Sequence, residues 1–121
     1  MRNLARTYKA TLFVGALLVW ASSSALAVDV EAAKALARQN NCLKCHGVDK
    51  DKEGPGYNKV AAKYKGKADA EEKLIHHITS GEKAKFPDGH EEEHKIVKSK
   101  DKAEIKNLVD WILSLEGGTK Y

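Results

Sequence analysis

The stretch Cys42-Leu43-Lys44-Cys45-His46 holds the only two cysteines of the 121-residue chain, three positions apart and followed at once by a histidine. Thiols at this spacing lie within about one helical turn, so both can add across the two vinyl groups at one edge of a porphyrin. The adjacent His46 then falls beneath the iron as a proximal ligand. The motif therefore predicts one covalently attached haem c, held through Cys42 and Cys45.

Three other interpretations of the cysteine pair stay open. A redox motif of the thioredoxin type expects a βαβ pattern, and no stretch of this sequence alternates as a strand does. A zinc site would combine Cys42 and Cys45 with His90 and His94, but 44 residues separate the two halves, where a zinc finger has about 12 to 15. A plain structural disulfide is not excluded by two cysteines alone.

The first 27 residues have the layout of a bacterial export signal. Basic residues precede an apolar run over 10–21, and Ala25-Leu26-Ala27 offers small residues at the cleavage site. The basic residues are Arg2, Arg6 and Lys9. The apolar run reaches only ~18 Å as a helix against a hydrocarbon core of ~30 Å, which favours a cleaved signal over a retained anchor. We expect residues 1–27 to be removed and a periplasmic product without a stable membrane span.

The remaining residues, 28–121, form one expected domain with little net charge. The whole chain has 21 Lys and Arg against 17 Asp and Glu, but the signal takes three of the basic residues, which leaves a net charge of +1. This balance argues against nucleic-acid binding, which needs a concentrated basic face. A domain this small buries a modest share of its surface, so it is often stabilised by a disulfide, a metal or a prosthetic group.

The spacing of apolar residues predicts an all-α domain of about four helices joined by Gly- and Lys-rich loops. Asp69 with Glu72 forms an N-terminal box, and Gly81 ends the helix that follows. In the last helix the apolar stripe puts Trp111 and Val109 at its flanks. The helices are expected at about 30–39, 57–64, 70–80 and 101–115.

With these elements in place, the sequence resembles the small bacterial monohaem class I cytochromes c. The matching parts are an Ala-rich first helix leading into C-x-x-C-H, the segment Gly54-Pro55-Gly56-Tyr57, the run 59–64 and the ending 108–115. The resemblance implies a class I cytochrome c fold, with the helices wrapped around one haem. It also implies that the Pro55 carbonyl accepts the outer N–H of His46, a bond that fixes the imidazole tautomer.

One departure from the family concerns the sixth iron ligand. The resemblance implies a methionine in the loop before the last helix, yet the only methionine of this chain is Met1. Counting forward from Gly81 with the family's spacing puts the ligand near Glu91, whereas counting back from Trp111 puts it near Lys95. The two counts disagree by four residues, so the loop over 81–101 is expected to carry an insertion.

Imidazole is the better iron ligand among the side chains of this loop. We favour His94, because the apolar pair Ile96-Val97 that follows it is suited to seal the distal edge of a haem. His90 is the alternative, and a lysine ligand or an open site remain possible outcomes.

Two further histidines lie on the third expected helix. At 100° per residue, His76 points away from the apolar stripe and is expected in solvent, while His77 lies about 60° from Leu74, at the edge of the buried face. In the family a polar side chain near this position reaches a haem propionate. We therefore expect His77 to be a propionate partner.

A second imidazole in place of a thioether lowers the reduction potential, because it removes the ligand that stabilises ferrous iron. The sequence thus predicts a low-potential electron carrier for periplasmic redox proteins, not an enzyme. The alternative is a haem protein whose sixth site is open or displaceable and binds small ligands, as a sensor or small catalyst. Lysines that are suited to steer an acidic partner are Lys50, Lys52, Lys59, Lys63, Lys65 and Lys67.

Overall fold

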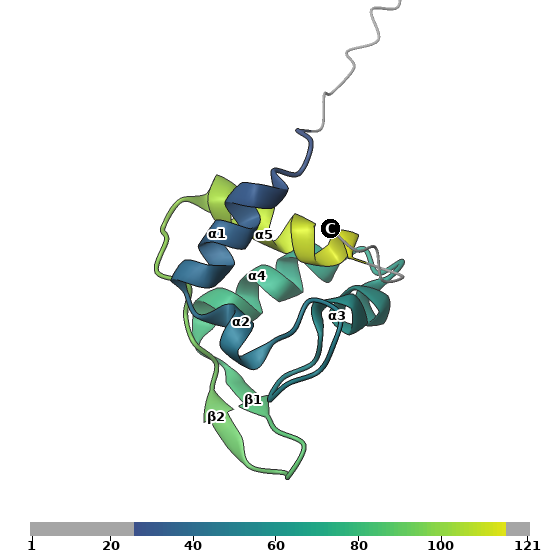
Figure 1. Ribbon diagram of the computed structural model, residues 1–121, viewed down its shortest axis with the longest axis vertical. Coiled ribbons are helices and arrows are strands. Elements are labelled where there is room, and N and C mark those ends of the chain that lie inside the picture. Colours follow the sequence, from purple (N-terminus) through teal and green to yellow (C-terminus); the bar gives the residue numbers. More distant parts are fainter. Residues whose placement is uncertain (1–25, 116–121) are drawn as a thin grey trace, which may run out of the picture.

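The computed structural model describes residues 26–115, which form five helices and one two-stranded hairpin (Figure 1). In chain order these are α1 (Val30–Gln39), α2 (Cys42–Cys45), α3 (Tyr57–Tyr64), α4 (Ala70–Ser80), β1 (Lys83–Lys85), β2 (Glu91–Glu93) and α5 (Lys102–Ser114). No helix within the described range is both long and apolar enough to cross a bilayer. Residues 1–25 of the expected signal peptide lie outside the described residues.

The expected helical fold is confirmed, and local signals account for the helix bounds. α1 begins at Val30 because the Asp29 carboxylate accepts the Ala32 N–H at 3.0 Å. Asp101 caps α5 in the same way, accepting the Ala103 N–H at 2.8 Å. α4 ends at Gly81, whose φ of 72° lies in the left-handed region that glycine adopts without strain.

The expected N-terminal box of α4 is wrong. Asp69 precedes the helix, but its side chain makes no capping hydrogen bond. The carboxylate instead pairs with Lys73 Nζ at 2.7 Å, one turn along the same helix face. Lys73 competes with the helix N–H groups for the Asp69 carboxylate. α4 therefore begins without the pair of side-chain hydrogen bonds that Asp69 and Glu72 were expected to form.

Two elements were not expected. α2 is a single turn that carries the cysteine motif, entered through Asn41 with a left-handed φ of 57°.

The antiparallel hairpin of β1 and β2 lies in the loop where the two counts for the ligand position disagreed. Its outer pairs, Lys83 with Glu93 and Lys85 with Glu91, place opposite charges side by side. Its strands are short and almost wholly exposed, so they carry no apolar alternation to signal them.

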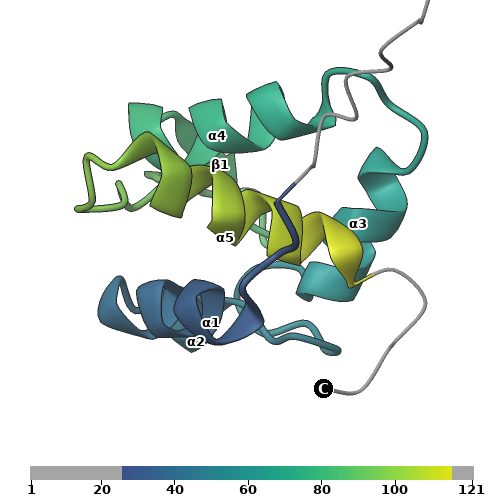
Figure 2. The same ribbon diagram turned by 90° about the horizontal axis from the view of Figure 1, so that it is seen from above.

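α5 is the centre of the core, in contact with α1, α3 and α4. Figure 2 shows it between α4 on one side and α1 on the other. Val109 and Trp111 are both fully buried, although they were expected at the flanks of the buried stripe. The reason is that three helices cover α5 on several sides, so its buried face is wider than one stripe.

Asp29 and Asn107 join α1 to α5 by two hydrogen bonds of 2.8 Å.

Candidate haem site

The cysteine motif occupies the single turn of α2, which brings the two sulfur atoms to one side of the chain. Both cysteine side chains are half-buried. Burial raises the pKa of Cys42. The sulfur of Cys42 also accepts a hydrogen bond from the hydroxyl of Tyr57. Burial and the neighbouring Glu53 carboxylate raise the pKa of Cys45, whose Sγ lies 3.4 Å from Glu53 Oε2. Both sulfurs lie on the single turn of α2, at one edge of the site.

His46 follows α2 directly, and its ring is held by the backbone of the next loop. Its Nδ1 lies 2.7 Å from the Pro55 carbonyl oxygen, so the N–H on Nδ1 donates and Nε2 is left as the basic nitrogen. A Cβ at Gly54 would lie 2.6 Å from His46 Cε1, so only glycine allows the loop to approach this closely. The ring of Tyr57 stacks on His46 with centroids 5.3 Å apart.

His94 lies immediately after β2, and its ring faces that of His46. The two ring centroids are 6.1 Å apart, with an angle of 45° between the ring planes. The Nδ1 atom of His94 lies 3.0 Å from the carbonyl oxygen of Lys95, so Nε2 is again the nitrogen without a proton. Burial, and after it the electrostatic effect of the neighbouring His77 and His46, lowers the pKa of His94 and favours its neutral form.

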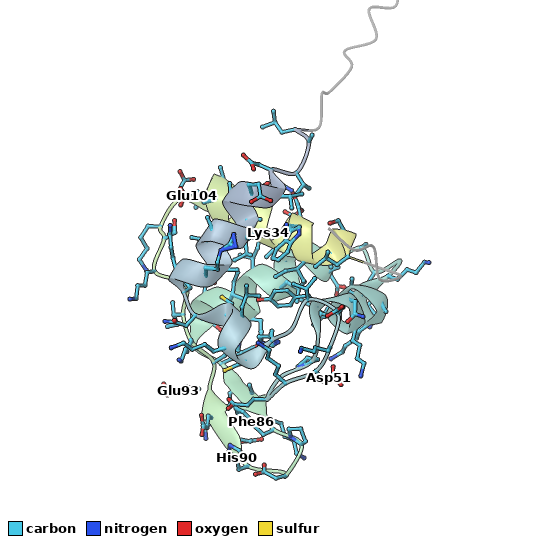
Figure 3. All side chains as sticks on the ribbon, viewed as in Figure 1. Lys34, Asp51, Phe86, His90, Glu93 and Glu104 are labelled. Atoms are coloured by element: carbon cyan, nitrogen blue, oxygen red, sulfur yellow. The ribbon has the colours of Figure 1, made fainter. Side chains whose placement is uncertain are left out.

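His90 lies at the far end of the hairpin, beside Phe86, on whose ring it stacks (Figure 3). Its Nδ1 pairs with the Asp88 carboxylate, and its Nε2 lies 3.4 Å from Glu92 Oε1. These two carboxylates raise the pKa of His90. Both ring nitrogens therefore face acids on the hairpin itself.

The zinc interpretation is not supported by this arrangement. Among residues 26–115, no group of three or more Cys, His, Asp or Glu side chains is placed to hold a metal ion. Cys42, Cys45, His90 and His94 are therefore not assembled as a tetrad. Of the two loop histidines, the structure brings only His94 to the ring of His46.

The side chain of His77, on α4, lies against the ring of His94. The two ring centroids are 4.1 Å apart, and His77 Nδ1 lies 2.6 Å from Glu82 Oε1. His76 points outward with 66% of its side chain exposed, as expected from the helical spacing. Glu82 and Tyr57 were not among the predicted site residues, although the Gly-Pro-Gly-Tyr segment that contains Tyr57 was a signal for Tyr57.

The spacing of His46 and His94 fits one iron between them. A metal–imidazole bond of ~2 Å and a further ~1 Å from nitrogen to ring centre, taken on both sides, give centroids about 6 Å apart. The observed 6.1 Å matches this value, and the angle of 45° between the planes would be compatible with a shared metal, because a coordinated imidazole can turn about its bond to the metal. The two thiols of α2 complete a donor set that suits a haem c.

Comparisons with known proteins point to the same family. A model of the cytochrome c family matches residues 30–116. Cytochrome c2 of Rhodocyclus tenuis is 37% identical over 83 residues, which cover 68% of this chain and 90% of the relative. Cytochrome c-551 of Allochromatium vinosum is 35% identical over 86 residues, covering 66% of this chain and 82% of the relative.

Solved structures agree with the sequence relatives. The crystal structure of the class 1 cytochrome MtoD from Sideroxydans lithotrophicus ES-1 is 77% identical, covers 74% of this chain and 98% of its own, and superposes with a TM-score of 0.71. Wild-type cytochrome c552 of Nitrosomonas europaea is 36% identical, covers 69% of this chain and 99% of its own, and gives a TM-score of 0.56. This chain therefore belongs to the cytochrome c family, as a monohaem class I electron carrier whose haem is attached through the Cys42 and Cys45 motif.

Proposed function

We propose that this cytochrome c carries electrons at low potential with His46 and His94 as the two axial ligands of its haem. The observation that supports this assignment is the 6.1 Å separation of the two ring centroids. Because the chain's only methionine is Met1, within the segment we propose is removed, the mature chain offers no thioether for the sixth position. The bound haem supplies one-electron chemistry, its iron alternating between the ferric and ferrous states.

The protein's own residues hold the two imidazoles ready for this role. The carbonyl oxygens of Pro55 and Lys95 each accept a hydrogen bond from a histidine Nδ1, at 2.7 and 3.0 Å. Each bond fixes the tautomer that leaves Nε2 for the iron and makes that nitrogen more basic. Because both ligands are held in place and need not move when the oxidation state changes, the reorganisation energy of electron transfer stays small.

A second imidazole places the potential below that of methionine-ligated relatives, since thioether ligation is what raises it. We infer a role in passing electrons between periplasmic redox proteins after removal of residues 1–27 as a signal. The lysines of α3 and its flanking loops are all exposed and are suited to steer an acidic partner. Such steering acts on the rate of encounter more than on affinity.

The expected contact of His77 with a haem propionate stays a prediction. The partner that the structure gives to His77 Nδ1 is the carboxylate of Glu82.

Absorption spectra of the purified holoprotein test the ligand assignment. We expect a low-spin ferric haem without a sulfur-to-iron band, and a ferrous form that does not bind CO rapidly. His94→Ala should give a high-spin haem that binds CO, whereas His90→Ala should leave the spectrum unchanged. The reverse pattern would assign His90. Rapid CO binding by the unmodified protein would favour the alternative function, a haem protein with a displaceable sixth ligand.

A further inference from the structure

Glu82 and His77 lie beside His94 as a hydrogen-bonded pair. Glu82 Oε1 accepts from His77 Nδ1 at 2.6 Å, and the ring of His77 lies against that of His94 with centroids 4.1 Å apart and planes tilted by 43°. The second oxygen of the same carboxylate lies 3.4 Å from His76 Nε2. Glu82 thus fixes the ring that touches the distal imidazole.

The backbone of Glu82 is joined to His94 as well. Its carbonyl oxygen accepts the His94 N–H at 2.9 Å, directly beside the first pair of the hairpin, Lys83 with Glu93. Glu82 also follows Gly81, where α4 ends. One residue therefore links the distal histidine to α4 through its main chain and, by way of His77, through its side chain.

We infer that Glu82 and His77 form a brace that sets the rotation of the His94 imidazole about its bond to the iron and slows its release. The inference rests on the proposed function, because it requires His94 as the sixth ligand. A two-stranded hairpin is marginally stable on its own, so a ligand at its base needs a second attachment. α4 provides it, since α4 packs on α5 in the core.

His77 acts on His94 through ring contact, with the two ring centroids 4.1 Å apart. A ring at that distance blocks rotation of its neighbour. The Glu82 hydrogen bond prevents His77 from turning away, so His77 and Glu82 are positioning residues.

Four variants of the holoprotein test the brace. His77→Ala removes the ring, Glu82→Ala removes the carboxylate, Glu82→Gln keeps a neutral acceptor for His77 Nδ1, and His76→Ala removes only the outer contact. The readouts are the electron paramagnetic resonance signal of the ferric haem, which responds to the angle between the imidazole planes, and the rate at which added cyanide binds. Far-ultraviolet circular dichroism checks the fold of each variant.

We expect His77→Ala and Glu82→Ala to shift the resonance signal and to speed cyanide binding about two- to tenfold, the factor that corresponds to losing one aromatic contact. Glu82→Gln should restore most of both properties, and His76→Ala should match the unmodified protein. If His77→Ala does not fold, Glu82→Ala carries the test.

His94→Ala separates the two hypotheses. If it stays low-spin, the ligand assignment fails and the brace fails with it. If it becomes high-spin while His77→Ala and Glu82→Ala behave as His76→Ala does, the ligand assignment stands and the brace is wrong.

Discussion

The side chain of Asn40 joins the end of α1 to the segment that follows His94. Its Nδ2 donates to the Leu36 carbonyl at 2.9 Å, and its Oδ1 accepts the Lys98 N–H at 2.8 Å. Val97, the residue before Lys98, is buried and donates its N–H to the Ile78 carbonyl of α4 at 2.9 Å. The chain beyond His94 is therefore tied to two helices, although the hairpin before it is exposed.

Asn40→Ala should destabilise the folded protein by about 1–3 kcal/mol, because it removes two hydrogen bonds that each contribute about 0.5–1.5 kcal/mol. Urea denaturation of the ferric protein measures the free energy of unfolding. Gln39→Ala, an exposed change at the neighbouring position, should stay within about 0.5 kcal/mol of the unmodified protein. Equal stability of the two variants would contradict the bridging role of Asn40.

Gly54→Ala should impair the proximal side of the site. The added Cβ would lie 2.6 Å from His46 Cε1, so either the ring or the loop that carries Pro55 must move. We expect less haem per polypeptide and a loss of low-spin absorption, measured on the purified protein.

The matched control is Gly66→Ala, where a Cβ has open space but φ is +70°. This change should cost about 1 kcal/mol of stability for the left-handed backbone and leave the haem spectrum as it was. An unchanged spectrum in both variants would show that the close approach at Gly54 is not needed.

His94→Met should raise the reduction potential. A thioether stabilises ferrous iron relative to an imidazole, and we expect a rise on the order of 0.1 V, within the ~0.8 V range over which axial ligands tune haem. A spectroelectrochemical titration measures it, and a sulfur-to-iron band should appear in the ferric spectrum. The control, His90→Met, should keep the original potential. A rise in the control alone would move the ligand to His90.

The pH dependence of the hairpin should follow the pair of His90 and Asp88. The Asp88 and Glu92 carboxylates raise the pKa of His90 above 6.5, and the His90 N–H groups lower the pKa of Asp88 below 3.8. The contribution of His90 is fully present below its unfolded pKa and is lost as pH rises through its raised folded pKa. That of Asp88 is present above its unfolded pKa and is lost as pH falls through its lowered folded pKa.

An NMR titration of the His90 ring protons tests this pair. Asp88→Asn should bring the pKa of His90 back toward 6.5, because it removes the first partner of the imidazolium. A pKa at or below 6.5 in the unmodified protein would contradict the contact.

Local signals in the sequence were sufficient for most of the helices. The predicted ranges 30–39 and 57–64 coincide with α1 and α3, since a cap such as Asp29 and an apolar stripe act within a few turns of chain. The hairpin escaped prediction because charged residues line both of its strands, and its pairing gains little from burial. The full burial of Trp111 was missed because it depends on helices that are distant in the sequence.

The sequence by itself determined that two thiols and His46 lie within one turn, the pattern of a covalent haem, and that no methionine follows Met1. It did not determine which loop histidine meets His46. Only the tertiary structure decided that, because the choice depends on how the hairpin pairs and where α4 holds its base. The pairing of the hairpin and its attachment to α4 leave His90 among the acids of the hairpin. They bring the ring of His94, which lies 48 positions after His46, to a centroid distance of 6.1 Å from the ring of His46.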